Sequence, residues 1–258
     1  MKLPASIRLT YRNILVNMDL GTMVFMLGLP AIYLLVLGTM FQAIIPGVSV
    51  SGSLKVEYTH FLGAGIVAMQ TLTAGNIGGS MLWSDRRWGM FEQLLVGPFK
   101  RTDYLLGIIM VAIIFTLGGS LIMLLLSVAA SGGYVFTIQS VGLIVAALIL
   151  GTVLFSALYL IVSTIAKTMQ AYNTITIVLF FVLDFASPAF YPINASSEAV
   201  IRYMSLVNPL TYVVEIVRTS MIATPDMATM LQLIVLTIVT SVLFVIARQM
   251  YKRVKLGI

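Results

Sequence analysis

The sequence predicts an all-α protein that crosses a membrane several times. Hydrophobic residues make up 60% of its 258 positions and charged residues only 9%, and the mean hydropathy is +1.05. Soluble domains usually carry about 25% charged residues. The long uncharged stretches also disfavour a membrane β-barrel, whose strands show alternating patterns of about 10 residues. We therefore predict a single helical transmembrane domain that covers residues 1–258.

The first predicted element is an amphipathic helix over residues 3–19. Arg8 and Arg12 lie together on one side of it, and a helix of this kind lies in the plane of the lipid headgroups. A soluble segment ahead of the first span is the alternative. The apolar positions recur at helical spacing and are Leu3, Ile7, Tyr11, Ile14, Leu15 and Met18.

Six membrane spans are predicted after this helix. A span needs about 20 predominantly apolar residues, and six stretches meet or nearly meet that length. The first is too long for the apolar core of a cleaved signal peptide, which has about 7–15 residues, so we expect it to be retained. The spans cover residues 21–45, 60–83, 104–130, 138–166, 169–191 and 229–247.

The distribution of basic residues predicts the orientation of the spans, because Lys and Arg concentrate in cytoplasmic loops. With six spans, 12 of the 15 basic residues share one side, so both termini are expected in the cytoplasm. A seventh span within residues 192–228 would spoil this asymmetry. We therefore interpret residues 192–228 as an external cap or a re-entrant helical hairpin. The net charge of +6 is explained by these loops and does not indicate nucleic-acid binding.

Polar residues inside the predicted spans are candidates for a translocation pathway. Neutral polar side chains in a span can instead form hydrogen bonds between helices. A carboxylate inside a span usually faces a water-filled cavity or a partner, so Asp184 is expected either to line the pathway or to pair with Arg202 or Arg218. The four candidates are Gln70, Asn76, Asn173 and Asp184.

The sequence offers little support for catalysis in this chain. It has no cysteine and a single histidine, His60, so we predict no metal site and no catalytic residue. The Gly-x-x-x-x-Gly-Lys-[Ser/Thr] phosphate loop and the Gly-x-Ser-x-Gly nucleophile motif are both missing. If a nucleotide supplies energy, another polypeptide is expected to bind it.

Residues 84–101 form a charged, amphipathic segment between two spans. The apolar stripe Phe91, Leu94 and Leu95 predicts a short helix that packs against its own bundle and still offers a surface to a partner. Pro98 should end this helix, because proline disfavours a helical conformation at the residue before it. Glu92 is expected to contact a basic group on the partner or to pair with Arg86 or Arg87.

At this segment the sequence resembles the membrane subunits of ABC-2 type ATP-binding cassette transporters. The matching motif is Asp85-Arg86-Arg87-x-Gly89-x-x-Glu92-x-Leu94-Leu95-x-x-Pro98, and the second match is Asn208-Pro209-Leu210-Thr211-Tyr212 followed by Glu215 and Arg218. Arg87 stands where the family commonly has Glu, and Gly97 replaces Ser or Thr. Within the family, the sequence is most similar to the daunorubicin-type drug exporter and nodulation-exporter permeases.

The resemblance implies a permease subunit of an ATP-driven exporter in a prokaryotic plasma membrane. Two copies would line the pathway, and two cytosolic ATPase subunits would bind ATP and Mg. Residues 84–101 would form the coupling segment, and residues 192–228 the external cap. The implied coupling residues are Arg86, Arg87, Gly89, Phe91, Glu92, Leu94, Leu95 and Pro98, and the implied cap residues are Asn208, Pro209, Tyr212, Glu215 and Arg218.

One expected contact and two other functional hypotheses also follow from the sequence. Glu215 and Arg218 are three residues apart, and such a pair stabilises a helix by only about 0.2–0.5 kcal/mol, so we expect it to fix the cap helix. Asp184 leaves open an ion-coupled secondary transporter. An integral membrane enzyme that acts on lipids is the third hypothesis, and it lacks a clustered nucleophile, base or metal site.

Overall fold

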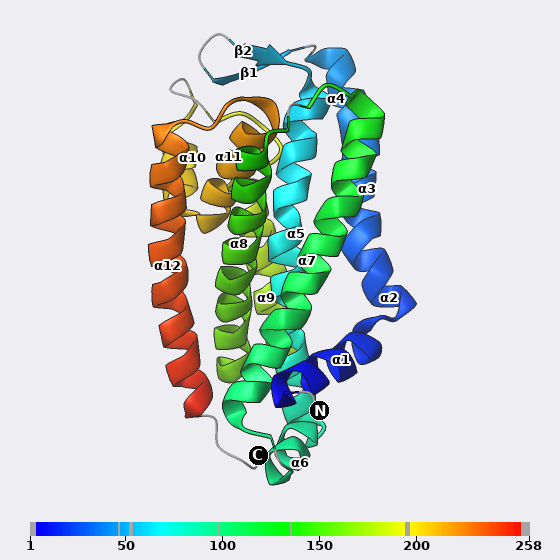
Figure 1. Ribbon diagram of the computed structural model, residues 1–258, viewed down its shortest axis with the longest axis vertical. Coiled ribbons are helices and arrows are strands. Elements are labelled where there is room, and N and C mark those ends of the chain that lie inside the picture. Colours follow the sequence, from blue (N-terminus) through cyan, green and yellow to red (C-terminus); the bar gives the residue numbers. More distant parts are fainter. Residues whose placement is uncertain are drawn as a thin grey trace.

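The computed structural model describes residues 4–45, 47–51, 54–97, 99–134, 136–193 and 197–253. This part of the chain is a bundle of long helices with one short two-stranded hairpin (Figure 1). Helix α6 (Met90–Val96) lies at one end of the bundle, and strands β1 (Val48–Ser51) and β2 (Leu54–Val56) lie at the other. We refer to these as the α6 end and the hairpin end. Pro98 of the predicted coupling segment lies outside the described residues.

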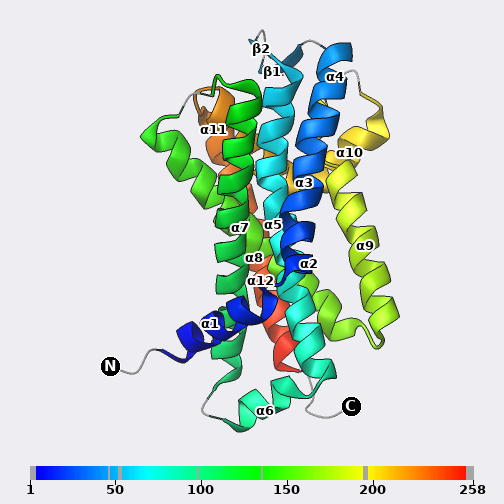
Figure 2. The same ribbon diagram turned by 90° about the vertical axis from the view of Figure 1, so that its right-hand side faces the viewer.

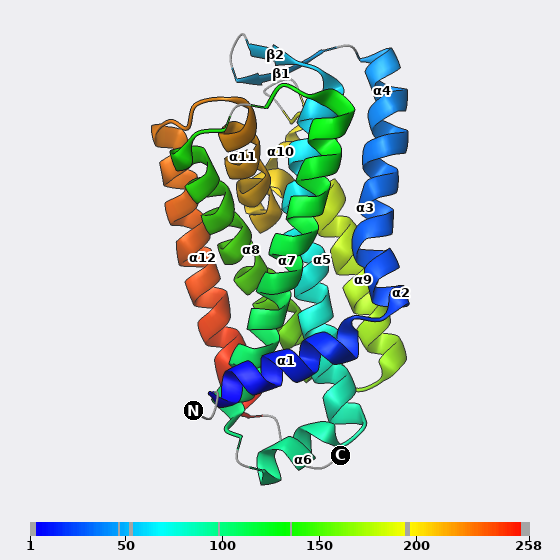
Figure 3. The same ribbon diagram turned by 45° about the vertical axis from the view of Figure 1, so that its right-hand side comes forward.

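Helix α1 (Ala5–Asn17) lies across the α6 end, at a large angle to the long helices (Figure 3). It packs against α7 (Arg101–Ser131). The contact is close because Gly107 of α7 has no side chain. A Cβ at that position would lie 3.1 Å from Leu9 Cβ, and Leu9 is buried. The helix predicted over residues 3–19 therefore exists, with described bounds at Ala5 and Asn17.

The first predicted span is helical from Leu20 to Ile44 but irregular inside. It consists of α2 (Leu20–Met23), α3 (Leu29–Ile32) and α4 (Gly38–Ile44), joined by two π-helical turns, η1 (Val24–Gly28) and η2 (Tyr33–Leu37). Pro30 cannot donate a backbone hydrogen bond, and π-helical turns are one way for a helix to absorb such an interruption. Figure 2 shows this helix on the same side of the bundle as α9 (Met169–Phe185).

Helix α5 (Tyr58–Arg87) is the centre of the bundle and is buried along most of its length. It packs against α7 and α8 (Ile138–Ile165). Glycines on α5 allow the backbones to approach closely, which is the usual device of membrane helices. A Cβ at Gly75 would lie 2.6 Å from Phe155 Cβ, and one at Gly79 would lie 2.5 Å from Tyr159 Cβ. The α5–α8 contact therefore depends on the missing side chains.

Four helices in the described part are long and apolar enough to cross a membrane: Leu20–Ile44, α7, α8 and α12 (Met227–Lys252). The chain is thus a multi-pass helical membrane protein. The other two predicted spans are helices too, but they miss this criterion for different reasons. Helix α5 carries polar residues because protein surrounds it. Helix α9 has only 17 residues.

Helix α9 ends at Phe185, whereas the sequence predicted a span up to Tyr191. Pro188 explains this end, because proline has no N–H and disfavours a helical conformation just before it. Ser187 Oγ also donates to the Asp184 carbonyl at 2.8 Å. The hydroxyl thus satisfies a carbonyl that the helix leaves without an intrahelical partner.

Residues 192–228 contain two helices, α10 (Ala199–Val207) and α11 (Pro209–Ile222), which meet at an angle of 87°. If they are counted as one broken span, the described part has up to five candidate spans. Helix α11 packs against α5, α8 and α12, and most of its side chains are buried. The predicted cap thus includes a helix that is inserted into the hairpin-end half of the bundle.

Candidate functional site

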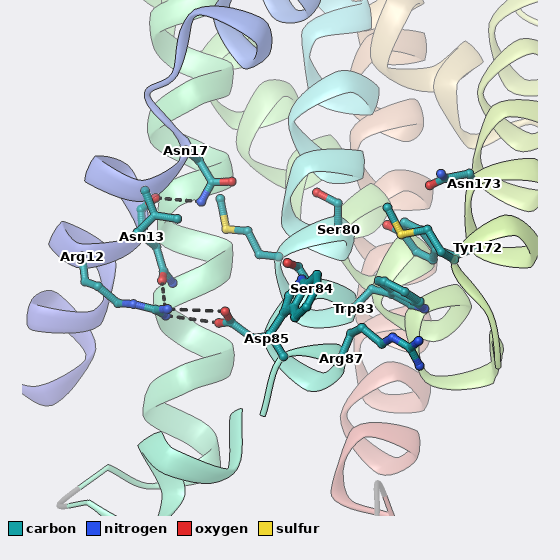
Figure 4. A pocket seen from close by; sticks show the side chains of 14 residues that line it. Arg12, Asn13, Asn17, Ser80, Trp83, Ser84, Asp85, Arg87, Tyr172 and Asn173 are labelled. Atoms are coloured by element: carbon teal, nitrogen blue, oxygen red, sulfur yellow. Dashed lines mark hydrogen bonds and ion pairs between the residues drawn. The ribbon is translucent and has the colours of Figure 1, made fainter. Parts of the chain in front are cut away.

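A cavity of about 540 Å³ opens at the α6 end, between α1, α5 and α9. In Figure 4, the α5 residues Ser80, Trp83 and Asp85 lie between the α1 side of the cavity and the α9 side. Amides, hydroxyls, two indoles and two guanidinium groups line it. We call this space the α6-end cavity.

A second cavity, of about 370 Å³, continues from it along α5 and α9. Ser80, Tyr172 and Asn173 line both cavities. Phe25 and Ile177 make the second one more apolar. We call it the inner cavity, and the two together the α5–α9 groove.

The groove contains two of the four predicted pathway residues. Asn76 on α5 and Asn173 on α9 both line the inner cavity. Gln70 lies farther along α5 and lines neither cavity. It is fully buried, and its side-chain nitrogen donates to the Met26 carbonyl at 3.3 Å. In this conformation Gln70 therefore joins α5 to the first span, which is the alternative that the sequence left open.

Asp184 is fully buried near the hairpin-end terminus of α9. In the part of the chain that the structure describes, neither carboxylate oxygen has a hydrogen-bond partner. Asp184 also lines neither cavity of the groove. The predicted ion pair with Arg202 or Arg218 is therefore not formed.

Arg218 instead binds backbone carbonyls and an aromatic ring. Its guanidinium donates to the Pro188 carbonyl at 2.7 Å and to the Phe61 carbonyl at 3.4 Å. It also lies 3.7 Å from the centre of the Phe61 ring, a favourable cation–π arrangement. The carbonyls of Pro188 and Ala189 lie beyond the end of α9, where no helix satisfies them, and Arg218 on the inserted helix α11 donates to both.

Glu215 and Arg218 attract each other electrostatically, but they are not in direct ion-pair contact, because each has another partner. Glu215 accepts a hydrogen bond from Gln232 of α12, and Arg218 faces the end of α9. The prediction assumed an exposed cap helix on which an i, i+3 pair would be the nearest option. Insertion of α11 into the bundle gives each side chain a tertiary partner instead.

The remaining predicted cap residues hold the bend between α10 and α11. Asn208 caps α11 by accepting from Leu210 N at 3.0 Å. Its side-chain nitrogen donates to the Leu183 carbonyl at 2.6 Å. Pro209 occupies the first helical position of α11, where a missing N–H is tolerated. Tyr212 Oη donates back to the Leu206 carbonyl at 2.9 Å.

A polar cluster joins α1 to the last turns of α5 and to α7. The Arg12 guanidinium lies 3.1 Å from the Asp85 carboxylate. Tyr104 Oη donates to the same carboxylate at 2.7 Å. In the next position, Arg86 donates to the Ser163 carbonyl of α8 at 2.6 Å. These contacts fix the end of α5 just before the chain turns into α6.

Helix α6 is anchored to the bundle by its apolar stripe. Gly89 begins the helix with φ of +70°, a left-handed conformation that favours glycine. Phe91 is 2% exposed, and its ring lies 5.2 Å from that of Tyr104 and 5.8 Å from that of Tyr251. Leu94 and Leu95 are half-buried against the same cluster. The stripe therefore faces the protein's own helices.

The opposite face of α6 is open to solvent. Val96 is 90% exposed, and Glu92 is also exposed. Trp88, in the turn between α5 and α6, is 79% exposed. We call Trp88, Glu92 and Val96 the α6 surface. An exposed indole beside a rigidly seated short helix is typical of a protein-binding surface, since aromatic residues are enriched in interface cores.

The chain was compared with models of known protein families. The family model for ABC-2 type transporters matches residues 7–222, from α1 to the end of α11. The chain belongs to the ABC-2 type transporter family. A search of curated proteins finds no match. The matched domain is the permease component of such transporters, not the ATP-binding cassette.

Sequence patterns missed several residues that build this site. Tyr251 and Asn13 are examples, because nothing local marks them. Tyr251 packs on α6 from the other end of the chain, and the burial of Asn13 depends on how α1 crosses the bundle. Among the described residues, no group of three or more His, Cys, Asp or Glu side chains could hold a metal ion.

Proposed function

We propose that the chain is the membrane-spanning subunit of an ATP-driven exporter and that it docks on a cytosolic ATPase through α6. Membership of the ABC-2 type transporter family supports the role as a transporter subunit. The observation that carries the docking proposal is the α6 surface, since Trp88 and Val96 are exposed while Phe91 seats the helix. In this proposal ATP and Mg are bound by the ATPase, and α6 transmits its movement to α5.

The same proposal includes a membrane topology with six spans and both termini in the cytoplasm of a prokaryotic cell. The four long apolar helices, α5 and α9 would be the spans, and α10 with α11 would be a re-entrant pair on the external side. The α6 end is then cytoplasmic. Support comes from the basic residues, because Arg8, Arg12, Arg87 and Arg248 all lie on helices at that end.

The α5–α9 groove is the proposed path of the substrate. It opens at the α6 end and leads along α9, whose outer face is apolar and exposed, with Ile177 55% and Phe181 44% accessible. A second copy that faces this groove would close it and bring Asn76 and Asn173 of each copy to a shared pathway. Drug-like molecules are the substrate class suggested by the subfamily resemblance. No observation favours ion coupling through Asp184.

The docking proposal predicts a specific effect of charge reversal at Glu92. Glu92→Arg should leave the chain inserted in the membrane and dimeric, but weaken its association with the ATPase. A charge left unpaired in a partly buried contact typically costs about 2–5 kcal/mol. The measurement is the amount of ATPase that co-purifies with each variant from detergent-solubilised membranes.

The matched control is Glu57→Arg, which reverses an exposed carboxylate at the hairpin end. It should retain the wild-type amount of ATPase. Equal co-purification with all three proteins would show that α6 does not contact the ATPase through Glu92.

A further inference from the structure

The α6-end cavity contains buried hydrogen-bond donors that its own residues leave unsatisfied. Asn13 is 2% exposed, and its side-chain nitrogen has no acceptor in the described part of the chain. Tyr172 is 3% exposed, and its hydroxyl is likewise unpartnered there. Both side chains line the cavity. Buried polar groups without a partner are rare, so a ligand with acceptor oxygens would satisfy groups that the protein alone does not.

The charges around the cavity favour an anion. Arg12 is already matched by Asp85, the one acidic side chain among the described lining residues, and Tyr104 also donates to that carboxylate. Arg87 lines the same cavity and is exposed, and no carboxylate of the described residues lies within ion-pair distance of it. One guanidinium therefore remains available to a negatively charged ligand.

The shape of the groove favours a ligand with an apolar tail. The inner cavity continues from the polar one, and Phe25, Ile77 and Ile177 line it. Trp83 and Trp88 border the polar part, and indoles of this kind are enriched at the level of lipid headgroups. A headgroup at Arg87 would thus have its chain directed along α5 and α9.

We propose that the α5–α9 groove binds an anionic phospholipid from the cytoplasmic leaflet. The phosphate would accept hydrogen bonds from Arg87, on the α9 side of the cavity (Figure 4), and an acyl chain would lie in the inner cavity. A planar guanidinium suits this role because it can donate two parallel hydrogen bonds to a phosphate. The inference rests on the proposed orientation, in which the α6 end faces the cytoplasm.

Native mass spectrometry of the purified full-length chain tests the proposal. Phosphatidylglycerol is titrated against phosphatidylcholine with the same acyl chains, for wild type and for Arg87→Gln. Wild type should bind phosphatidylglycerol more tightly, and Arg87→Gln should weaken that binding about fivefold to tenfold, since one surface cation is worth about that much with anionic lipid. Phosphatidylcholine binding should weaken less, because its choline cation offsets the charge of the phosphate, and Arg87→Lys should retain part of the preference.

Arg248→Gln is the matched control. Arg248 is an exposed cation in the last turns of α12, at the α6 end of the bundle, and it does not line the groove. An equal loss in Arg248→Gln would overturn the site in favour of general surface charge. Unchanged phosphatidylglycerol binding in Arg87→Gln would also overturn it. Glycerol phosphate, titrated alone, separates lipid from free anion: binding as tight as that of the lipid would contradict a role for the acyl chain.

The result is separable from the proposed docking on an ATPase. Lipid binding is measured on the chain without any partner, whereas Glu92→Arg is scored by co-purification. A second variant, Tyr172→Phe, removes a buried unpartnered hydroxyl that lines both cavities without changing charge, and it should also weaken phosphatidylglycerol binding. Loss of ATPase association in Arg87→Gln with unchanged lipid binding would assign Arg87 to docking and reject the lipid site.

Discussion

Gly79→Ala should lower the stability of the folded chain by about 1–3 kcal/mol, the usual cost of forcing extra atoms into a packed core. The added Cβ would lie 2.5 Å from Tyr159 Cβ and 2.9 Å from the Tyr159 backbone. The neighbour is main chain as well as side chain, so no rotamer change relieves the clash. Helices α5 and α8 would have to separate along the central contact of the bundle.

The measurement is the apparent melting temperature of the detergent-solubilised chain. Gly118→Ala is the control, because Gly118 lies on α7 and a Cβ there meets nothing within 4 Å. Alanine has a higher helix propensity than glycine by about 1 kcal/mol, so the control should melt at the wild-type temperature or above it. Equal melting temperatures for both variants would contradict the close α5–α8 packing.

Trp88→Ala is expected to weaken ATPase association by at least about 30-fold, which corresponds to the loss of an interface hot spot of about 2 kcal/mol. Trp88 is 79% exposed, so its removal should cost the isolated chain little stability. The indole would be the largest apolar group that the α6 surface offers to a partner. Association is measured by titrating the purified ATPase onto the chain in nanodiscs.

Tyr203→Ala provides the matched control. Tyr203 is a similarly exposed aromatic residue, 71% accessible, on α10 in the hairpin-end half of the bundle. Its replacement should leave ATPase association unchanged. If Trp88→Ala binds the ATPase as tightly as wild type does, the exposed face of α6 is not the docking surface.

The sequence predicted the helical membrane class and most element positions, because long apolar runs leave few alternatives. Helix α8 begins at Ile138 as predicted and ends one residue early, at Ile165. Helix α1 was predicted from amphipathic spacing alone. The family was already suggested by two short motifs, Asp85–Pro98 and Asn208–Tyr212.

The contacts of individual polar residues could not be predicted from the sequence, because they depend on tertiary packing. Gln70 and Arg218 were predicted from their polarity, but which groups they contact depends on helices that are far away in the chain. Arg218 donates to the Pro188 carbonyl just beyond the end of α9. No local pattern shows that a residue of α11 lies next to this carbonyl. Phe91 illustrates the same point, since its stripe could have faced either a partner or the bundle.

ATP hydrolysis by the reconstituted complex tests the central claim most directly. The wild-type chain would be placed in liposomes with and without the ATPase that co-purifies with it. We expect no hydrolysis by the chain alone, and hydrolysis by the complex that rises with a transported substrate and falls in Trp88→Ala. Transport by the chain alone, with no ATPase bound in native membranes, would contradict the account.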